Sequence, residues 1–100
     1  MSMLVIFGPE ADEDVEAAMF WYHQRSSGLE NRFMRELEAA LRYVRERPRS
    51  FPLIADDMRQ ISMARFPYVI IYSVHRTHVE VIRVFHTKQD AVNKLPVRYR

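Results

Sequence analysis

The sequence predicts an α+β fold with the element order β-α-α-β-β-β, in which a helical hairpin packs on one face of a small antiparallel sheet. Near the N-terminus, a short apolar run precedes two segments whose apolar residues recur with helical spacing. About three residues separate these two segments, so the helices must fold back as an antiparallel pair. The second half of the chain holds β-branched and aromatic runs typical of strands. Because helices and strands are separated along the chain, the class is α+β.

The first strand and the first helix lie on either side of Gly8. Residues 3–7, MLVIF, form the apolar run, and Pro9 is well placed at a first helical position. The helix is expected to run to about Arg25. Helical spacing gives it a core face of Ala11, Val15, Ala18 and Tyr22. Its first turns carry the acidic residues Glu10, Asp12, Glu13 and Asp14, which suit the positive end of the helix dipole.

The second helix begins after the break at residues 26–28, SSG. Arginines near its C-terminal end and Pro48 as a stop predict that it closes at about Arg47. Its expected core face consists of Leu29, Phe33, Leu37, Leu41 and Val44.

The strands follow a segment expected to be a loop, residues 49–57, with Phe51 against the core. Residues 58–65 are expected to form an edge strand. Residues 66–74 are apolar at nearly every position, as in a central strand, and residues 77–86 follow a tight connection. Alternation predicts Tyr68, Ile70 and Tyr72 on one face of the central strand and Val69 and Ile71 on the other.

Length and composition predict one domain over residues 1–100. With 48% hydrophobic and 28% charged residues the chain is expected to be soluble. No apolar run approaches the ~18 residues of a membrane span, and the N-terminus lacks the pattern of a signal peptide. The absence of cysteine excludes disulfides and thiolate chemistry, which fits a cytoplasmic protein. The tail, residues 87–100, has no clear periodicity and is expected to be partly mobile.

Charge is distributed unevenly. Residues 1–57 contain 7 basic and 11 acidic side chains, whereas residues 58–100 contain 8 and 2. Either the C-terminal half meets an anionic partner, or its loops and tail are simply basic. No glycine-rich phosphate loop, metal-ligand spacing or nucleophile beside a base is present, so we expect no cofactor and no metal.

Two groups of residues have a structural and a functional interpretation. Phe20 and Trp21 lie beside the core face of the first helix; they either fill the space between helix and sheet or form an exposed groove for a partner. A set on strands or strand ends offers phosphate-binding cations and a histidine that titrates near neutrality: Arg59, Arg65, Arg83, His86 and Lys88.

Arg83 and His86 could bind an anionic partner electrostatically or, if they act together, catalyse a proton transfer. In a regular strand they point to opposite faces, so they cooperate only where the strand bends, bulges or ends. Otherwise Arg83 pairs with Glu80 or a helix carboxylate and His86 caps the strand end. A metal site of His86 with the turn histidines, His75 and His78, is the weaker alternative.

Several segments of the chain resemble the ParE/RelE superfamily of toxins from type II toxin-antitoxin modules. The similarity covers nearly the whole chain, and its most specific parts are the Arg-Phe-Pro-Tyr strand entry and the later Arg-x-x-His. The matching segments are Ala11-x-x-Asp14-Val15, Leu29-Glu30-Asn31-Arg32-Phe33, Arg47-Pro48, Arg65-Phe66-Pro67-Tyr68-Val69-Ile70-Ile71-Tyr72 and Arg83-Val84-Phe85-His86.

The resemblance implies the same fold and a small acidic antitoxin whose disordered C-terminal segment folds onto the toxin near Phe20 and Trp21. The strand entry is more similar to the ParE-like branch, which inhibits DNA gyrase without an active site of its own. The RelE-like branch consists of ribosome-dependent mRNA endonucleases; its catalytic groups here would be Arg65, Arg83 and His86. This chain has Thr87 where some of those nucleases place a tyrosine. A third possibility is a degenerate toxin that only binds its antitoxin.

Overall fold

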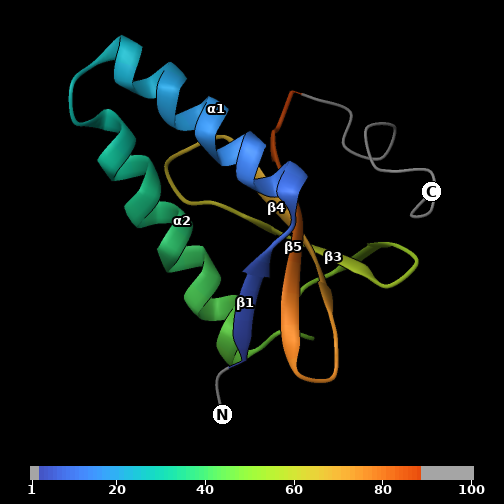
Figure 1. Ribbon diagram of the computed structural model, residues 1–100. Coiled ribbons are helices and arrows are strands. Elements are labelled where there is room, and N and C mark those ends of the chain that lie inside the picture. The colour runs from blue at the N-terminus through green and yellow to red at the C-terminus, as the bar shows by residue number, and fades with distance from the viewer. Residues whose placement is uncertain (1–2, 89–100) are drawn as a thin grey trace.

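The computed structural model describes residues 3–88, so the tail expected to be mobile lies, from residue 89 on, outside the described residues. Seven elements follow one another in the order of Figure 1: β1 (Leu4–Phe7), α1 (Pro9–Arg25), α2 (Leu29–Glu46), β2 (Leu53–Ala55), β3 (Met58–Ser62), β4 (Tyr68–Val74) and β5 (His78–His86). Gly28 joins the two helices with a φ of 89°, a left-handed conformation that glycine adopts without a Cβ clash. Among the helices of this part of the chain, none is both long and apolar enough to cross a bilayer.

The strands form one sheet in the order β1-β5-β4-β3-β2. The α+β class is confirmed, but the sheet is mixed rather than wholly antiparallel. β1 pairs in parallel with β5, from Leu4 opposite His78 to Phe7 opposite Val81. The helical hairpin carries the chain away from β1, and three successive antiparallel pairings then return β5 to its side.

Residues 49–57 are not entirely a loop. The short strand β2 pairs with β3, so β3 is not the edge strand that was expected. Three residues are too few for a periodic pattern, and that is why β2 has no signal in the sequence. β4 lies at the centre of the five strands, as predicted.

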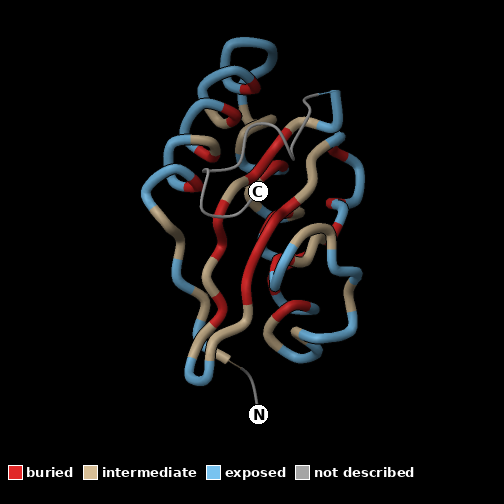
Figure 2. Tube along the Cα trace, turned by 90° about the vertical axis from the view of Figure 1, so that its right-hand side faces the viewer, coloured by how far each residue is buried: buried red, intermediate tan, exposed pale blue. Residues whose placement is uncertain are grey.

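The main core lies between the helical hairpin and one face of the sheet (Figures 1 and 2). Every predicted core residue of α1 is buried, and in α2 only Leu29 is partly exposed. Phe51 packs against this core as expected. Ile70 and Tyr72 belong to it, whereas Ile71 faces a smaller cluster with Met58, Ile82 and Phe85, so the predicted alternation of β4 is confirmed.

A register shift in the β4–β5 pair changes which residues of β5 face the helices. Arg83 lies opposite Ile71 and Val81 opposite Tyr72, which leaves Ile82 as an extra residue. Val79 and Val81 face the helices before this bulge, and Val84 faces them after it. The bulge therefore sets the direction of every side chain at the C-terminal end of β5.

Candidate functional site

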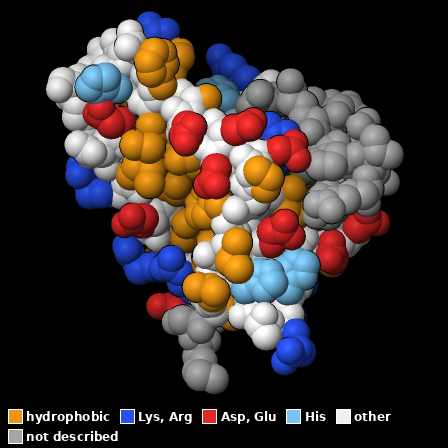
Figure 3. All heavy atoms as spheres, in the orientation of Figure 1, with side chains coloured by type: hydrophobic (Ala, Val, Ile, Leu, Met, Phe, Trp, Pro, Cys, Tyr) orange, Lys and Arg blue, Asp and Glu red, His pale blue; other side chains and the backbone are white. Residues whose placement is uncertain are grey.

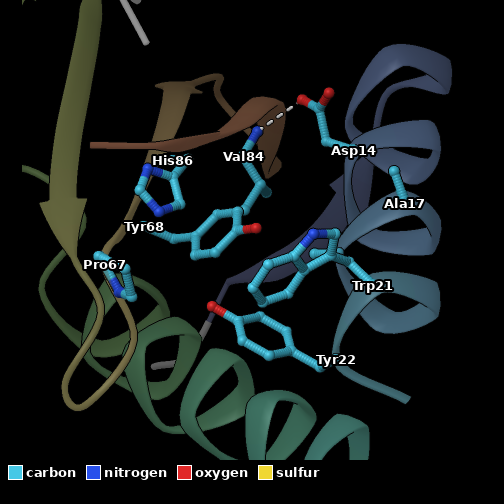
Figure 4. Close-up of a pocket in the computed structure, with 9 residues that line it drawn as sticks. Asp14, Ala17, Trp21, Tyr22, Pro67, Tyr68, Val84 and His86 are labelled. Atoms are coloured by element: carbon cyan, nitrogen blue, oxygen red, sulfur yellow. Dashed lines mark hydrogen bonds between the residues drawn. The ribbon is translucent and has the colours of Figure 1, made fainter. Parts of the chain in front are cut away.

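A groove of about 580 Å³ opens between α1 and the adjoining ends of β4 and β5 (Figure 4). Its volume lies within the range of about 300 to 1,000 Å³ typical of ligand sites. It is lined by Asp14, Ala17, Ala18, Trp21, Tyr22, Pro67, Tyr68, Val84 and His86.

Aromatic rings form most of the groove's walls. Trp21 meets Tyr22 edge to face at 5.1 Å between ring centroids, and Tyr68 meets His86 at 5.2 Å. Trp21 is 49% exposed, with the Arg25 guanidinium 4.1 Å from its ring, and Phe20 beside it is 67% exposed. These two residues thus do not fill the space between helix and sheet; they form an exposed aromatic surface, as the second interpretation predicts.

Two tyrosine hydroxyls provide the polar part of the floor. Burial raises the pKa of Tyr68 to about 12, and the neighbouring Tyr22 and the charge of Asp14 add to the rise. Burial also raises the pKa of Tyr22. Both hydroxyls therefore stay protonated at neutral pH, as neutral groups that donate hydrogen bonds.

Asp14 closes one end of the groove and binds two consecutive residues of β5. Its carboxylate accepts hydrogen bonds from Arg83 Nε at 2.7 Å and Nη2 at 2.9 Å. It also accepts the Val84 backbone N–H at 2.9 Å, the contact dashed in Figure 4. The pairing of β1 with β5 ends at Phe7, opposite Val81. Beyond this point β1 offers no carbonyl to β5, so the Asp14 carboxylate accepts the Val84 N–H instead. The hydrogen bond to Asp14 raises the pKa of Arg83.

Arg83 and His86 have different surroundings among residues 3–88. The Arg83 guanidinium lies 4.2 Å from the Phe85 ring, which belongs to the smaller cluster, whereas His86 lines the groove. The bulge precedes both residues, so they still alternate. Nδ1 of His86 accepts the Lys88 N–H at 3.1 Å. Arg83 pairs with the helix carboxylates of Asp14 and, at 3.7 Å, Glu10, and not with Glu80.

The other predicted cations lie in different places. Arg59 donates to the carbonyls of Arg49 at 3.2 Å and Phe51 at 2.8 Å and so holds the loop after α2. Arg65, at a φ of 65°, lies in the β3–β4 loop and donates to Glu36 at 2.9 Å. Thr87 N–H donates to the Pro67 carbonyl, which places Lys88 at that same end of the sheet. Arg65, His86 and Lys88 thus lie at the same end of the sheet, with the Arg65 side chain on Glu36, whereas Arg59 and Arg83 lie elsewhere.

The turn histidines are a separate pair. His75 and His78 stack at 4.7 Å between ring centroids, and His75 Nε2 lies 3.2 Å from Glu80 Oε1. His86 lies at the opposite end of the β4–β5 hairpin. Within residues 3–88, no three His, Asp or Glu side chains gather as a metal-binding group.

Sequence reasoning missed Asp14 and Tyr68 as groove residues. Asp14 was assigned to the helix dipole, although it directly precedes the buried Val15 and therefore lies at the margin of the core face. Tyr68 was predicted only to share a face of the central strand with Ile70 and Tyr72, and its position at the start of β4 was the available signal.

Comparisons with known proteins agree with this fold. A family model described as the ParE toxin of the type II toxin-antitoxin system, parDE, matches residues 5–91. A solved structure described as the chromosomal ParDE TA system from P. aeruginosa matches with a TM-score of 0.74, covering 85% of this chain and 96% of that chain. The two sequences are 12% identical, so this likeness concerns the fold. Among curated protein sequences, none is significantly similar.

Proposed function

Because the chain belongs to the ParE toxin family of type II toxin-antitoxin systems, we propose that it inhibits DNA gyrase and that a cognate antitoxin neutralises it at the Trp21 groove. The observation that carries the choice of target is the bidentate pair of Arg83 with Asp14. A ribonuclease would need Arg83 to bind a phosphate beside His86, and in this structure Arg83 binds Asp14 instead.

A non-enzymatic toxin also fits the surroundings of His86. General acid-base catalysis needs a proton-transfer group within reach of the reacting atoms and cations that hold the scissile phosphate. Arg59 donates to loop carbonyls, Arg83 pairs with Asp14 and Arg65 pairs with Glu36. Three of the four predicted cations are thus held by other parts of the chain, which suits contact with an anionic surface better than it suits cleavage.

The antitoxin's chemistry follows from the groove. Exposed rings of Phe20 and Trp21 favour an amphipathic segment whose apolar residues cover them. Two cations near the groove favour acidic residues in that segment: Arg25, over the Trp21 ring, and Lys88, which follows the end of β5 where His86 lines the groove. An acidic C-terminal segment of the antitoxin, disordered before binding, meets both demands.

Two parallel assays on the purified chain test the target. We expect inhibition of gyrase supercoiling with accumulation of cleaved DNA, and no cleavage of mRNA on translating ribosomes. His86→Ala, shown by circular dichroism to be folded, should keep most of the gyrase inhibition. Under the alternative, a RelE-like endoribonuclease, the same variant should lose about 10²- to 10⁴-fold of the mRNA cleavage rate.

A growth test separates both activities from a degenerate toxin. Induced expression of the chain without its antitoxin should stop growth, and co-expression of the antitoxin should restore it. Unimpaired growth with abundant folded chain would mean that only antitoxin binding remains.

A further inference from the structure

The outer side of α2 and the loop after it carry a concentration of arginine that neither the core nor the groove uses. All but Arg45 are exposed, and Arg45 is half-buried. We call this set the arginine face; its members are Arg32, Arg35, Arg42, Arg45, Arg47 and Arg49. Figure 3 shows basic side chains along the α2 margin of the molecule, while acidic ones gather over α1.

Helical geometry places three of these arginines in one row. At 100° per residue, Arg35, Arg42 and Arg45 fall within about 80° of one another. Arg35 and Arg42 lie opposite the buried side chains of α2, and Arg45 lies at the margin of the buried face, next to Leu41. Ten residues separate the first from the last, so the row extends about 15 Å along a rigid helix. Arg47 and Arg49 continue it past the helix end, where Arg59 holds the Arg49 carbonyl.

These arginines have no acidic partner in the part of the chain that the structure describes. Among residues 3–88, none of the six makes an ion pair. Glu30 and Glu36, the acidic residues nearest the start of α2, are paired with His23 and Arg65. Glu38 and Glu46 remain on this side and reduce, without cancelling, its positive charge.

The helix dipole does not account for the arrangement. Basic residues are favourable in the last turn, which explains Arg45. Arg32 lies in the first turn, where the dipole favours acidic residues, and Arg35 lies beyond the range of the dipole. The dipole therefore does not explain either of these two arginines.

We infer that the arginine face binds the phosphate backbone of duplex DNA. Guanidinium groups pair with phosphate oxygens in a bidentate manner that lysine does not reproduce. A strand of a duplex rises about 3.4 Å per phosphate, so a rigid row of about 15 Å spans roughly four of them. Tyr43, an exposed aromatic residue of α2, lies one residue beyond Arg42 and outside the row, so the face lacks the stacking surface typical of single-strand binders.

This surface is independent of the groove. No residue of α2 lines the groove, and the row faces away from the sheet. Duplex DNA and an antitoxin segment therefore bind without competing for residues. The inference also does not depend on gyrase being the target, because the DNA contact belongs to the chain itself.

The test measures binding of a fluorescently labelled duplex of about 20 base pairs by anisotropy, across a series of salt concentrations. The triple variant Arg35→Gln/Arg42→Gln/Arg45→Gln should bind at least about tenfold more weakly and lower the slope of log K against log salt by about 2 to 3. Arg42→Gln alone should lower the slope by about 1. Its matched control is Arg76→Gln, an identical change at the exposed β4–β5 turn, which should leave the slope unchanged.

Circular dichroism and urea unfolding must show that each variant is folded. Equal slopes for Arg42→Gln and Arg76→Gln would overturn the proposal, because they would mean that only net charge matters. It would also be overturned by single-stranded RNA binding more tightly than the duplex, or by an acidic peptide of equal charge displacing the duplex as well as unlabelled DNA does. If the chain bound duplex DNA as expected but did not inhibit gyrase, the proposed target would be wrong and the DNA-binding role of the arginine face would still hold.

Discussion

Asp14 on α1 and Arg83 on β5, 69 residues apart, form a bidentate ion pair whose carboxylate also accepts the Val84 backbone N–H. Both side chains are about 15% exposed. The contact joins the first helix to the strand edge just beyond the point where β1 leaves it. One side chain thus positions Arg83, completes the hydrogen bonding of β5 and closes the end of the groove.

The first prediction concerns the stability that Asp14 contributes. Asp14→Ala removes two hydrogen bonds from the partly buried Arg83 guanidinium and the acceptor of the Val84 backbone N–H, so the free energy of unfolding should fall by about 2 to 4 kcal/mol. Asp14→Asn keeps one acceptor oxygen for Val84 and should cost less. Urea unfolding measures both. Glu13→Ala removes the exposed neighbouring charge and should change stability by less than about 0.5 kcal/mol; equal losses at Glu13 and Asp14 would contradict the assignment.

The second prediction concerns the two faces of the central strand. Ile70 and Ile71 are fully buried in different clusters, so Ile70→Ala and Ile71→Ala should each cost about 2 to 5 kcal/mol through lost burial and the cavity left behind. Ser62→Ala, an exposed change at the end of β3, is the control. Losses below about 1 kcal/mol at both isoleucines would show that neither cluster is well packed.

The third prediction concerns alkaline pH. Tyr72 is buried and donates to the Pro48 carbonyl at 2.7 Å, and burial raises its pKa to about 12. In the unfolded chain a tyrosine ionises near pH 10. Between about pH 10 and 12 the unfolded state therefore binds fewer protons than the folded state, so the stability present below pH 10 should fall as the pH rises.

Urea unfolding at a series of pH values measures this loss. Tyr72→Phe should lower stability at neutral pH by about 1 to 2 kcal/mol, because the Pro48 carbonyl loses its donor. It should also flatten the alkaline decline, whereas Tyr43→Phe, at an exposed position, should not. An unchanged decline in Tyr72→Phe would assign the effect to other groups.

The fourth prediction concerns the groove and rests on the proposed antitoxin. Trp21→Ala removes the largest exposed ring of the groove and should weaken binding of the cognate antitoxin by at least about 2 kcal/mol, or roughly 30-fold. Added salt should slow association, because the partner is acidic and the cations Arg25 and Lys88 lie near the groove. Surface plasmon resonance measures both effects. Tyr43→Ala is the matched control, because it removes an exposed aromatic residue outside the groove. If neither added salt nor Trp21→Ala changed antitoxin binding, the interface would lie elsewhere.

Local apolar patterns in the sequence determined the elements of this fold. The faces of α1 and α2 were predicted correctly because helical spacing records which residues are buried, as Val15 and Phe33 show. The central position of β4 followed from apolar residues on both of its faces, as at Ile70 and Ile71. The motifs that resemble ParE toxins likewise lie within continuous segments, so the family was recognisable from the sequence.

Contacts between distant residues were decided only by the tertiary structure. The parallel pairing of β1 with β5, the short strand β2 and the bulge at Ile82 depend on which backbone lies alongside, and a one-dimensional pattern does not contain that information. The bulge and the end of β1 bring Arg83 to Asp14. The arginines of α2 were visible in the sequence, but only the tertiary structure shows that none of them makes an ion pair within residues 3–88.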